Sequence, residues 1–220
     1  MSAYQVTIQM SQQTVQQLLQ SGFSLYGLHA AGMSGGRALP TVWFSSSRFS
    51  SSTVVSWTED YQVYTSQSQV MPGAQITTNA SFPIAPGMQL DITDPSGFGQ
   101  VQQGGPPNAI GINNSTFAQL TVGLALGSSA GGSAPIHALP LSGNMMAVIT
   151  PVPKVFLVFS PTSMSPGMAV AQASGSGVLV DLTGSPSQTV TFDINSGWQG
   201  GPGVQVFPSN QSLAPILLQP

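Results

Sequence analysis

Apolar and polar residues alternate along most of this chain, which is the pattern of β-strands with one buried face. From Tyr4 to Met10 every second residue is apolar, and Gln or Thr stands between. Side chains two apart share a face of a strand, so this segment is expected to be half-buried. Similar segments are predicted as strands at 23–30, 40–45, 52–65, 74–79, 88–93, 109–113, 118–126, 145–150, 154–160, 177–183, 188–194 and 203–207. Many short strands divided by turns predict an all-β fold, a single-domain β-sandwich, jelly-roll-like or related, over residues 1–220.

One segment has the periodicity of a helix. Ser11 is a favourable N-cap, and the apolar residues Val15, Leu18 and Leu19 after it fall on one helical face. Gly22 can adopt the left-handed conformation that ends a helix. A single short N-terminal helix is therefore expected.

Four Pro-Gly pairs stand directly before alternating residues. Proline fixes the φ angle of the second position of a type II turn, and glycine accepts the positive φ of the third. Each pair is expected to form such a turn and to launch a strand. The pairs are Pro72–Gly73, Pro86–Gly87, Pro166–Gly167 and Pro202–Gly203.

The chain carries very little charge. Asp, Glu, Lys and Arg make up 4% of its 220 residues, and the formal net charge is −3, whereas about 25% is typical of globular domains. The three cations, Arg37, Arg48 and Lys154, cannot neutralise a row of phosphates. Nucleic-acid binding and a polybasic lipid anchor are therefore excluded, and the surface must consist of neutral Ser, Thr, Gln and Asn.

The sequence gives no support to a disulfide-stabilised, secreted or membrane-spanning protein. There is no cysteine, so disulfides and thiolate metal sites are absent. The N-terminus lacks the basic and apolar regions of a signal peptide, and no apolar run is long enough to form a transmembrane segment. We expect a protein that is cytoplasmic at synthesis, with later release left open.

Candidate catalytic motifs are weak. Two G-x-S-x-G matches, at 32–36 and 127–131, lack the following helix that a nucleophile elbow requires. The two histidines, His29 and His137, lie far apart in sequence and are interpreted as structural. No catalytic residue, metal ligand or cofactor is predicted, and the protein is not expected to be an enzyme.

The stretch 56–65, SWTEDYQVYT, is the best marked chemically. In a continuous strand Trp57, Glu59 and Tyr61 share one face, while Asp60 points to the other, so the two carboxylates cannot form a dyad. Glu59 then lies between two aromatic rings. Burying it unpaired would cost on the order of several kcal/mol, so it needs a cation or neutral hydrogen-bond donors nearby. Glu59 is expected to belong to a structural pair, to line a groove for a neutral ligand, or to lie exposed at a strand edge.

Three functions fit these observations. The first is a non-catalytic structural subunit that self-assembles into a homo-oligomer, filament or inclusion. The second is a lectin-like module that binds neutral carbohydrate, with Trp57, Glu59, Tyr61 and Trp198 as the platform. The third is a pore-forming cytolysin, in which Ser/Thr-rich segments rearrange into an amphipathic hairpin. Self-assembly is favoured, because so little charge opposes close packing.

Overall fold

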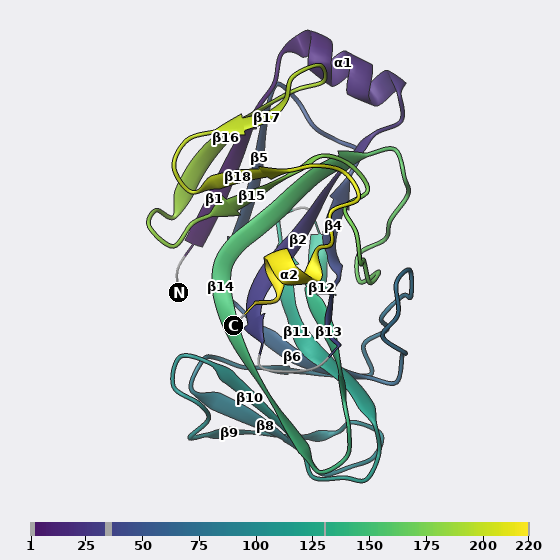
Figure 1. Ribbon diagram of the computed structural model, residues 1–220. Helices are drawn as coiled ribbons and strands as arrows, with labels where there is room; N and C mark the ends of the chain where they lie inside the picture. Colours follow the sequence, from purple (N-terminus) through teal and green to yellow (C-terminus); the bar gives the residue numbers. More distant parts are fainter. Residues whose placement is uncertain (1–2, 34–36, 130, 220) are drawn as a thin grey trace.

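A computed structural model describes residues 3–33, 37–129 and 131–219 and confirms an all-β, sandwich-like fold (Figure 1). In this part of the chain the strands form three sheets. The first has the order β17-β16-β1-β5, with β17 (Gly197–Gly200), β16 (Ser187–Asp193), β1 (Ala3–Gln9) and β5 (Ser52–Thr58). Its β1–β16 pair is parallel and its β1–β5 pair antiparallel.

The second sheet holds eight strands and runs through the middle of the molecule (Figure 1). Its main path is β18 (Val204–Phe207), β15 (Gly177–Asp181), β14 (Met145–Ser160), β10 (Ile110–Asn114), β8 (Met88–Ile92) and β9 (Gly99–Gln103). Two further strands, β2 (Ser24–Met33) and β4 (Val42–Ser46), branch from β14. The third sheet contains β3 (Leu39–Pro40), β13 (His137–Leu141), β11 (Leu120–Ser128), β6 (Gln62–Ser66), β7 (Ala80–Pro83) and β12 (Gly131–Pro135).

The N-terminal strand and helix follow the sequence prediction. In β1 the residues Val6 and Ile8 are fully buried, and Gln5 and Gln9 are exposed. Helix α1 (Gln12–Gln20) begins after Ser11, whose hydroxyl accepts a hydrogen bond from the Thr14 backbone N–H at 3.1 Å. Gly22 follows the helix with a φ of +71°. Helix α2 (Ala214–Leu217), a single turn near the C-terminus, was not predicted.

The four Pro-Gly pairs form turns as predicted, because each of their glycines has a positive φ of 80° to 88°. Two of the pairs launch the strands β8 and β18. The prediction of a strand at 74–79 is wrong. That segment and the one after Gly167 form an isolated bridge, Gln75–Met168, instead of a strand pair. Backbone hydrogen bonds flank the bridge, including one from the Gly73 N–H to the Ala169 carbonyl oxygen at 2.8 Å.

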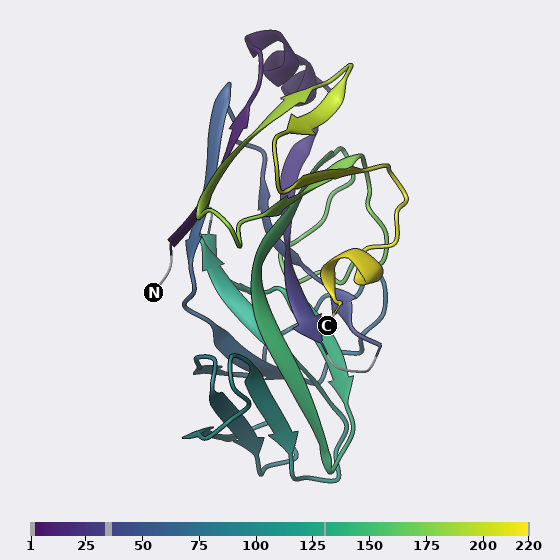
Figure 2. The same cartoon turned by 60° about the vertical axis from the view of Figure 1, so that its left-hand side comes forward.

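The two strands predicted at 145–150 and 154–160 are one strand, β14, which runs lengthwise through the molecule (Figures 1 and 2). Pro151 and Pro153 lie between the two predicted segments, and proline cannot donate a backbone hydrogen bond to a strand pair. The chain continues through them with a shift in its pairing to β2 between Pro151 and Val155. This shift in register lets the strand continue, although the two prolines have no backbone N–H to donate.

The core lies on both faces of the central sheet. The larger cluster takes residues from all three sheets, including Val6, Leu90 and Val122. A second cluster on β2, β14 and β15 is covered by residues near α2, such as Leu213 and Leu217. Strand β2 is therefore buried along nearly its whole length, as its burial pattern shows.

Candidate functional site

The predicted continuous strand at 52–65 is two strands. Strand β5 ends at Thr58, and β6 begins at Gln62 in a different sheet. Its apolar residues nevertheless stay inward, because Val55 and Val63 both belong to the main core cluster. The chain passes between the two sheets at residues 59–61, which explains why two charged residues stand in the middle of an alternating pattern.

Glu59 takes a neutral partner. The Tyr4 hydroxyl donates a hydrogen bond to the Glu59 Oε1 at 3.3 Å, and Glu59 is half-buried. Asp60 is exposed and accepts a short hydrogen bond from the Thr58 hydroxyl. The two carboxylates therefore have separate partners. The salt bridge present among the described residues, Lys154–Asp181 at 2.9 Å, does not involve Glu59.

The three aromatic residues of the predicted platform are buried. Trp57 and Tyr61 are each 4% exposed, and Trp198 is 3% exposed. Burial, followed by the negative charge of Glu59, raises the pKa of Tyr61 far above its usual value of 10.0. Stacking of a ligand on any of these rings would require the surrounding strands to separate.

Trp198 belongs to a different part of the core from the other platform residues. Its ring stacks on Phe159 with centroids 5.4 Å apart, and its indole N–H donates to the Ser176 carbonyl oxygen at 3.0 Å. Trp57 instead packs edge-to-face against Trp43 at 5.4 Å. The structure therefore brings Trp57, Glu59 and Tyr61 into one neighbourhood and leaves Trp198 in another.

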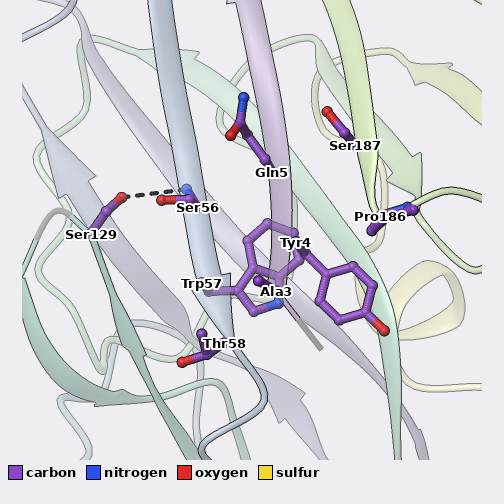
Figure 3. A pocket seen from close by; sticks show the side chains of 9 residues that line it. All are labelled: Ala3, Tyr4, Gln5, Ser56, Trp57, Thr58, Ser129, Pro186 and Ser187. Atoms are coloured by element: carbon purple, nitrogen blue, oxygen red, sulfur yellow. Dashed lines mark hydrogen bonds between the residues drawn. The ribbon is translucent and has the colours of Figure 1, made fainter. Parts of the chain in front are cut away.

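A shallow hollow lies beside Trp57, where β1, β5 and β16 come together (Figure 3). We call it the β1–β5 hollow; its volume is about 440 Å³. It is lined by Ala3, Tyr4, Gln5, Ser56, Trp57, Thr58, Ser129, Pro186 and Ser187. None of these side chains is charged. The lining offers hydroxyl and amide groups around the half-buried Tyr4, which is stacked on Trp57 at 5.6 Å.

Ser129 closes one side of the β1–β5 hollow. Its hydroxyl accepts a hydrogen bond from the Ser56 N–H at 3.3 Å, and its own N–H donates to the Ser56 carbonyl oxygen at 3.2 Å. This residue is the serine of the second G-x-S-x-G match, and His137 is fully buried elsewhere. The serine is thus engaged with the outer edge of β5. The first match, at 32–36, lies largely outside the described residues.

The two histidines are buried in the core. Nitrogen Nε2 of His137 accepts a hydrogen bond from the Leu124 N–H at 3.2 Å. Neither ring nitrogen of His29 makes a hydrogen bond of standard geometry among the described residues, and the Ala30 backbone is a weak partner only. Burial lowers the pKa of each from 6.5 to about 3, and for His29 the neighbouring His137 adds to this effect. Within the described ranges, no three His, Asp or Glu side chains gather as a metal site.

The ends of the sheets differ in how they are protected. Strand β7 ends in Pro83, and Ser129 contacts the outer edge of β5. Strand β9, with the sequence GQVQQ, ends the central sheet and pairs only with β8 in the described part of the chain. Lysine, inward charges and proline are the usual guards of such an edge, and β9 contains none of them.

Comparison with known proteins yields no relative: the chain matches no family model, no curated protein and no solved structure. No helix among the described residues is long and apolar enough to cross a membrane.

Proposed function

We propose that the protein is a non-catalytic structural subunit that self-assembles through the free edge of β9. The supporting observation is that this uncharged strand ends an eight-stranded sheet, and that its outer edge pairs with no other strand among the described residues. Unpaired N–H and C=O groups of an edge strand form a template for another strand. The net charge of −3 over 220 residues offers little electrostatic repulsion against a second copy.

The sequence of β9 suits antiparallel pairing with itself. A two-fold axis through Val101 would place Gln100 of one copy opposite Gln102 of the other. Both glutamines are exposed, and they can exchange side-chain hydrogen bonds across the axis. The contact would be isologous and would join two central sheets into one continuous sheet.

The absence of cysteine gives a direct test. Opposite residues of an antiparallel pair have Cα atoms about 4.5–5.5 Å apart, which suits a disulfide. Oxidising a mixture of the variants Gln100→Cys and Gln102→Cys should give a mixed covalent dimer in high yield. Either variant oxidised alone should give much less, because each cysteine would then face a glutamine. Equal yields in all three samples would refute the proposed register.

A charged residue placed on β9 tests whether this edge forms the contact. Gln102→Lys should shift the monomer–oligomer equilibrium toward monomer by about tenfold or more, measured by sedimentation across dilution. Each lysine would face Gln100 of the other copy, and the two like charges would lie diagonally across the axis and repel each other. The matched control, Gln13→Lys, adds the same charge on exposed α1 and should leave the equilibrium unchanged. A wild-type protein that is monomeric at every micromolar concentration would remove the proposal.

A second function is favoured by the β1–β5 hollow. Its uncharged lining of hydroxyl and amide groups beside Tyr4 suits a neutral hydroxylated ligand such as carbohydrate. Ser187→Trp should fill the hollow and abolish binding on a neutral glycan array. Thr189→Trp, an exposed position two residues farther along β16 and outside the hollow, should bind as the wild type does. Equal binding by both variants would place any carbohydrate site elsewhere.

A further inference from the structure

We infer that the end of the molecule that carries Phe117 docks on an uncharged, zwitterionic lipid surface. Phe117 is 93% exposed, which is extreme for an aromatic residue in a protein with a well-formed core. Two other large apolar side chains, Phe98 and Met145, are about half exposed and stand in segments that neighbour the Phe117 turn. We call these three residues the apolar tip. Exposed apolar side chains that gather at one end of a molecule mark protein or membrane contacts.

Backbone contacts bring the three segments of the apolar tip together. Met145 pairs with Asn114, and the Asn144 N–H donates to the Thr116 carbonyl oxygen at 2.9 Å. The Ser115 N–H donates to the carbonyl oxygen of Ile92, which pairs with Gly99 beside Phe98. The β10–β11 and β13–β14 connections lie at the end of the molecule opposite α1 (Figure 1).

The exposure of Phe117 is built into the turn that carries it. Asn114 is fully buried; its Oδ1 accepts from the Thr116 N–H and hydroxyl, and its Nδ2 donates to the Ala118 carbonyl oxygen at 2.8 Å. Both chain neighbours of Phe117 are thereby fixed. On the other side, the backbone of Gly143 approaches so closely that an added Cβ would lie 2.6 Å from the Phe117 carbonyl carbon. The fold therefore holds this ring outward.

The charges of the apolar tip select the kind of surface. The segments 93–98, 115–119 and 142–146 contain one charged residue, Asp94, and no cation. Anionic lipid attracts basic segments and would repel Asp94. A zwitterionic surface requires no cation. Aromatic and apolar side chains with a polar rim, here the Asn and Ser residues of the same turns, suit the interface between headgroups and acyl chains.

The shape of the apolar tip favours lipid over a protein partner. A side chain that is 93% exposed stands clear of its surroundings, so a protein would need a matching socket, whereas lipid closes around a protruding ring. This docking is independent of the β9 edge, since Gln100 and Gln102 contribute nothing to the apolar tip. It can fail while the proposed self-assembly holds, and the reverse is also possible.

Flotation with phosphatidylcholine vesicles tests the inference. Phe117→Ser should lower the partition coefficient by about tenfold or more, as expected from the burial of a phenylalanine side chain. The control, Leu19→Ser, changes an apolar residue that is 48% exposed on α1 at the opposite end, and it should partition as the wild type does. Both positions are exposed, and circular dichroism melting would verify that both variants fold.

The outcomes separate the alternatives. Replacing a third of the phosphatidylcholine with phosphatidylserine should not strengthen binding. Failure of the wild type to float with phosphatidylcholine, or an equal loss in both variants, would overturn the inference. Sedimentation without lipid provides the last arm: a lower oligomeric mass for Phe117→Ser than for Leu19→Ser would show that the apolar tip binds a second copy instead of lipid.

Discussion

His29 packs edge-to-face against Trp57, with ring centroids 5.0 Å apart and planes inclined by 89°. Trp43 contacts the same imidazole at 4.9 Å and 79°. A neutral imidazole fits such a site, because an N–H can point at an aromatic face without a formal acceptor. A protonated imidazole would place an unpaired charge in the core, and the cost of that charge makes the protein sensitive to acid.

We predict that stability falls as the pH drops from 6.5 toward 3. The folded-state pKa values of His29 and His137 are about 3, whereas an unfolded histidine titrates near 6.5. Between these values the unfolded chain binds more protons, so stability is full above pH 6.5 and is lost below it by up to about 1.4 kcal/mol per pH unit for each histidine. Urea denaturation at a series of pH values measures this slope.

The variant His29→Phe identifies the source of the slope. It keeps an aromatic ring between Trp43 and Trp57 and removes one titrating group, so the slope between pH 6 and 4 should be roughly halved. Hydrogen bonds lower the pKa values of Asp181 and Asp193, and Lys154 also lowers that of Asp181. The contribution of these two carboxylates to stability is therefore lost only at more acidic pH, below 3.8. An unchanged slope in His29→Phe would contradict this account.

We predict that Glu59 is held structurally by Tyr4. Glu59→Gln retains an acceptor oxygen for the Tyr4 hydroxyl and should change the free energy of unfolding by less than about 0.5 kcal/mol. Tyr4→Phe removes the hydroxyl and should cost about 1 kcal/mol. Tyr4→Ala also removes the ring stacked on Trp57 and should cost about 2 kcal/mol or more. Chemical denaturation followed by tryptophan fluorescence gives all three values.

We predict that Asn114→Ala is strongly destabilising, by about 2–4 kcal/mol, because it leaves buried partners in the Phe117 turn unsatisfied. The adjacent Asn113 provides the control. Its Nδ2 donates to Asp91 at 3.2 Å and to Ser115 at 3.0 Å in a partly exposed setting, so Asn113→Ala should cost about 1 kcal/mol or less. Equal costs in thermal denaturation would show that the turn is not fixed by Asn114.

We predict opposite outcomes for two glycines. A Cβ added at Gly99, at the start of β9, would lie 2.1 Å from the Asp91 carbonyl oxygen, so Gly99→Ala must displace backbone and should cost about 2 kcal/mol or more. Gly184 has no atom within 4 Å of an added Cβ and no positive φ. Gly184→Ala should be neutral or stabilising by up to about 1 kcal/mol, as measured by melting temperature.

Local periodicity predicts the parts of this fold in which each residue contacts only its sequence neighbours or a single packed surface. The strand at Val6 and Ile8, the cap at Ser11 and the turn at Gly87 are of this kind. The break between β5 and β6 could not be found in this way, because the inward alternation of Trp57 and Tyr61 continues through it. Only the transfer between sheets, a long-range event, separates the two strands.

The chemistry near Glu59 shows the same limit. Sequence reasoning predicted that a cation or a neutral donor must satisfy this carboxylate, and the structure supplies Tyr4, which is 55 positions away in the chain. No local signal links the two residues before β1 and β5 are paired. Phe117 likewise stands in a segment whose composition is ordinary, and its exposure follows from hydrogen bonds of Asn114 that only the folded turn contains.

Strand β14 spans residues 145–160 without a break and belongs to both ends of the molecule. At its start it borders the apolar tip through Met145, and farther along it lines the core beside β2 and β15. Amide protons along such a shared strand should exchange with solvent in one concerted opening, because neither end of the molecule can open without the strand that both ends share. A change at the apolar tip would therefore alter the exchange rates of the Val155 and Leu157 amide protons, which lie far from the site of contact.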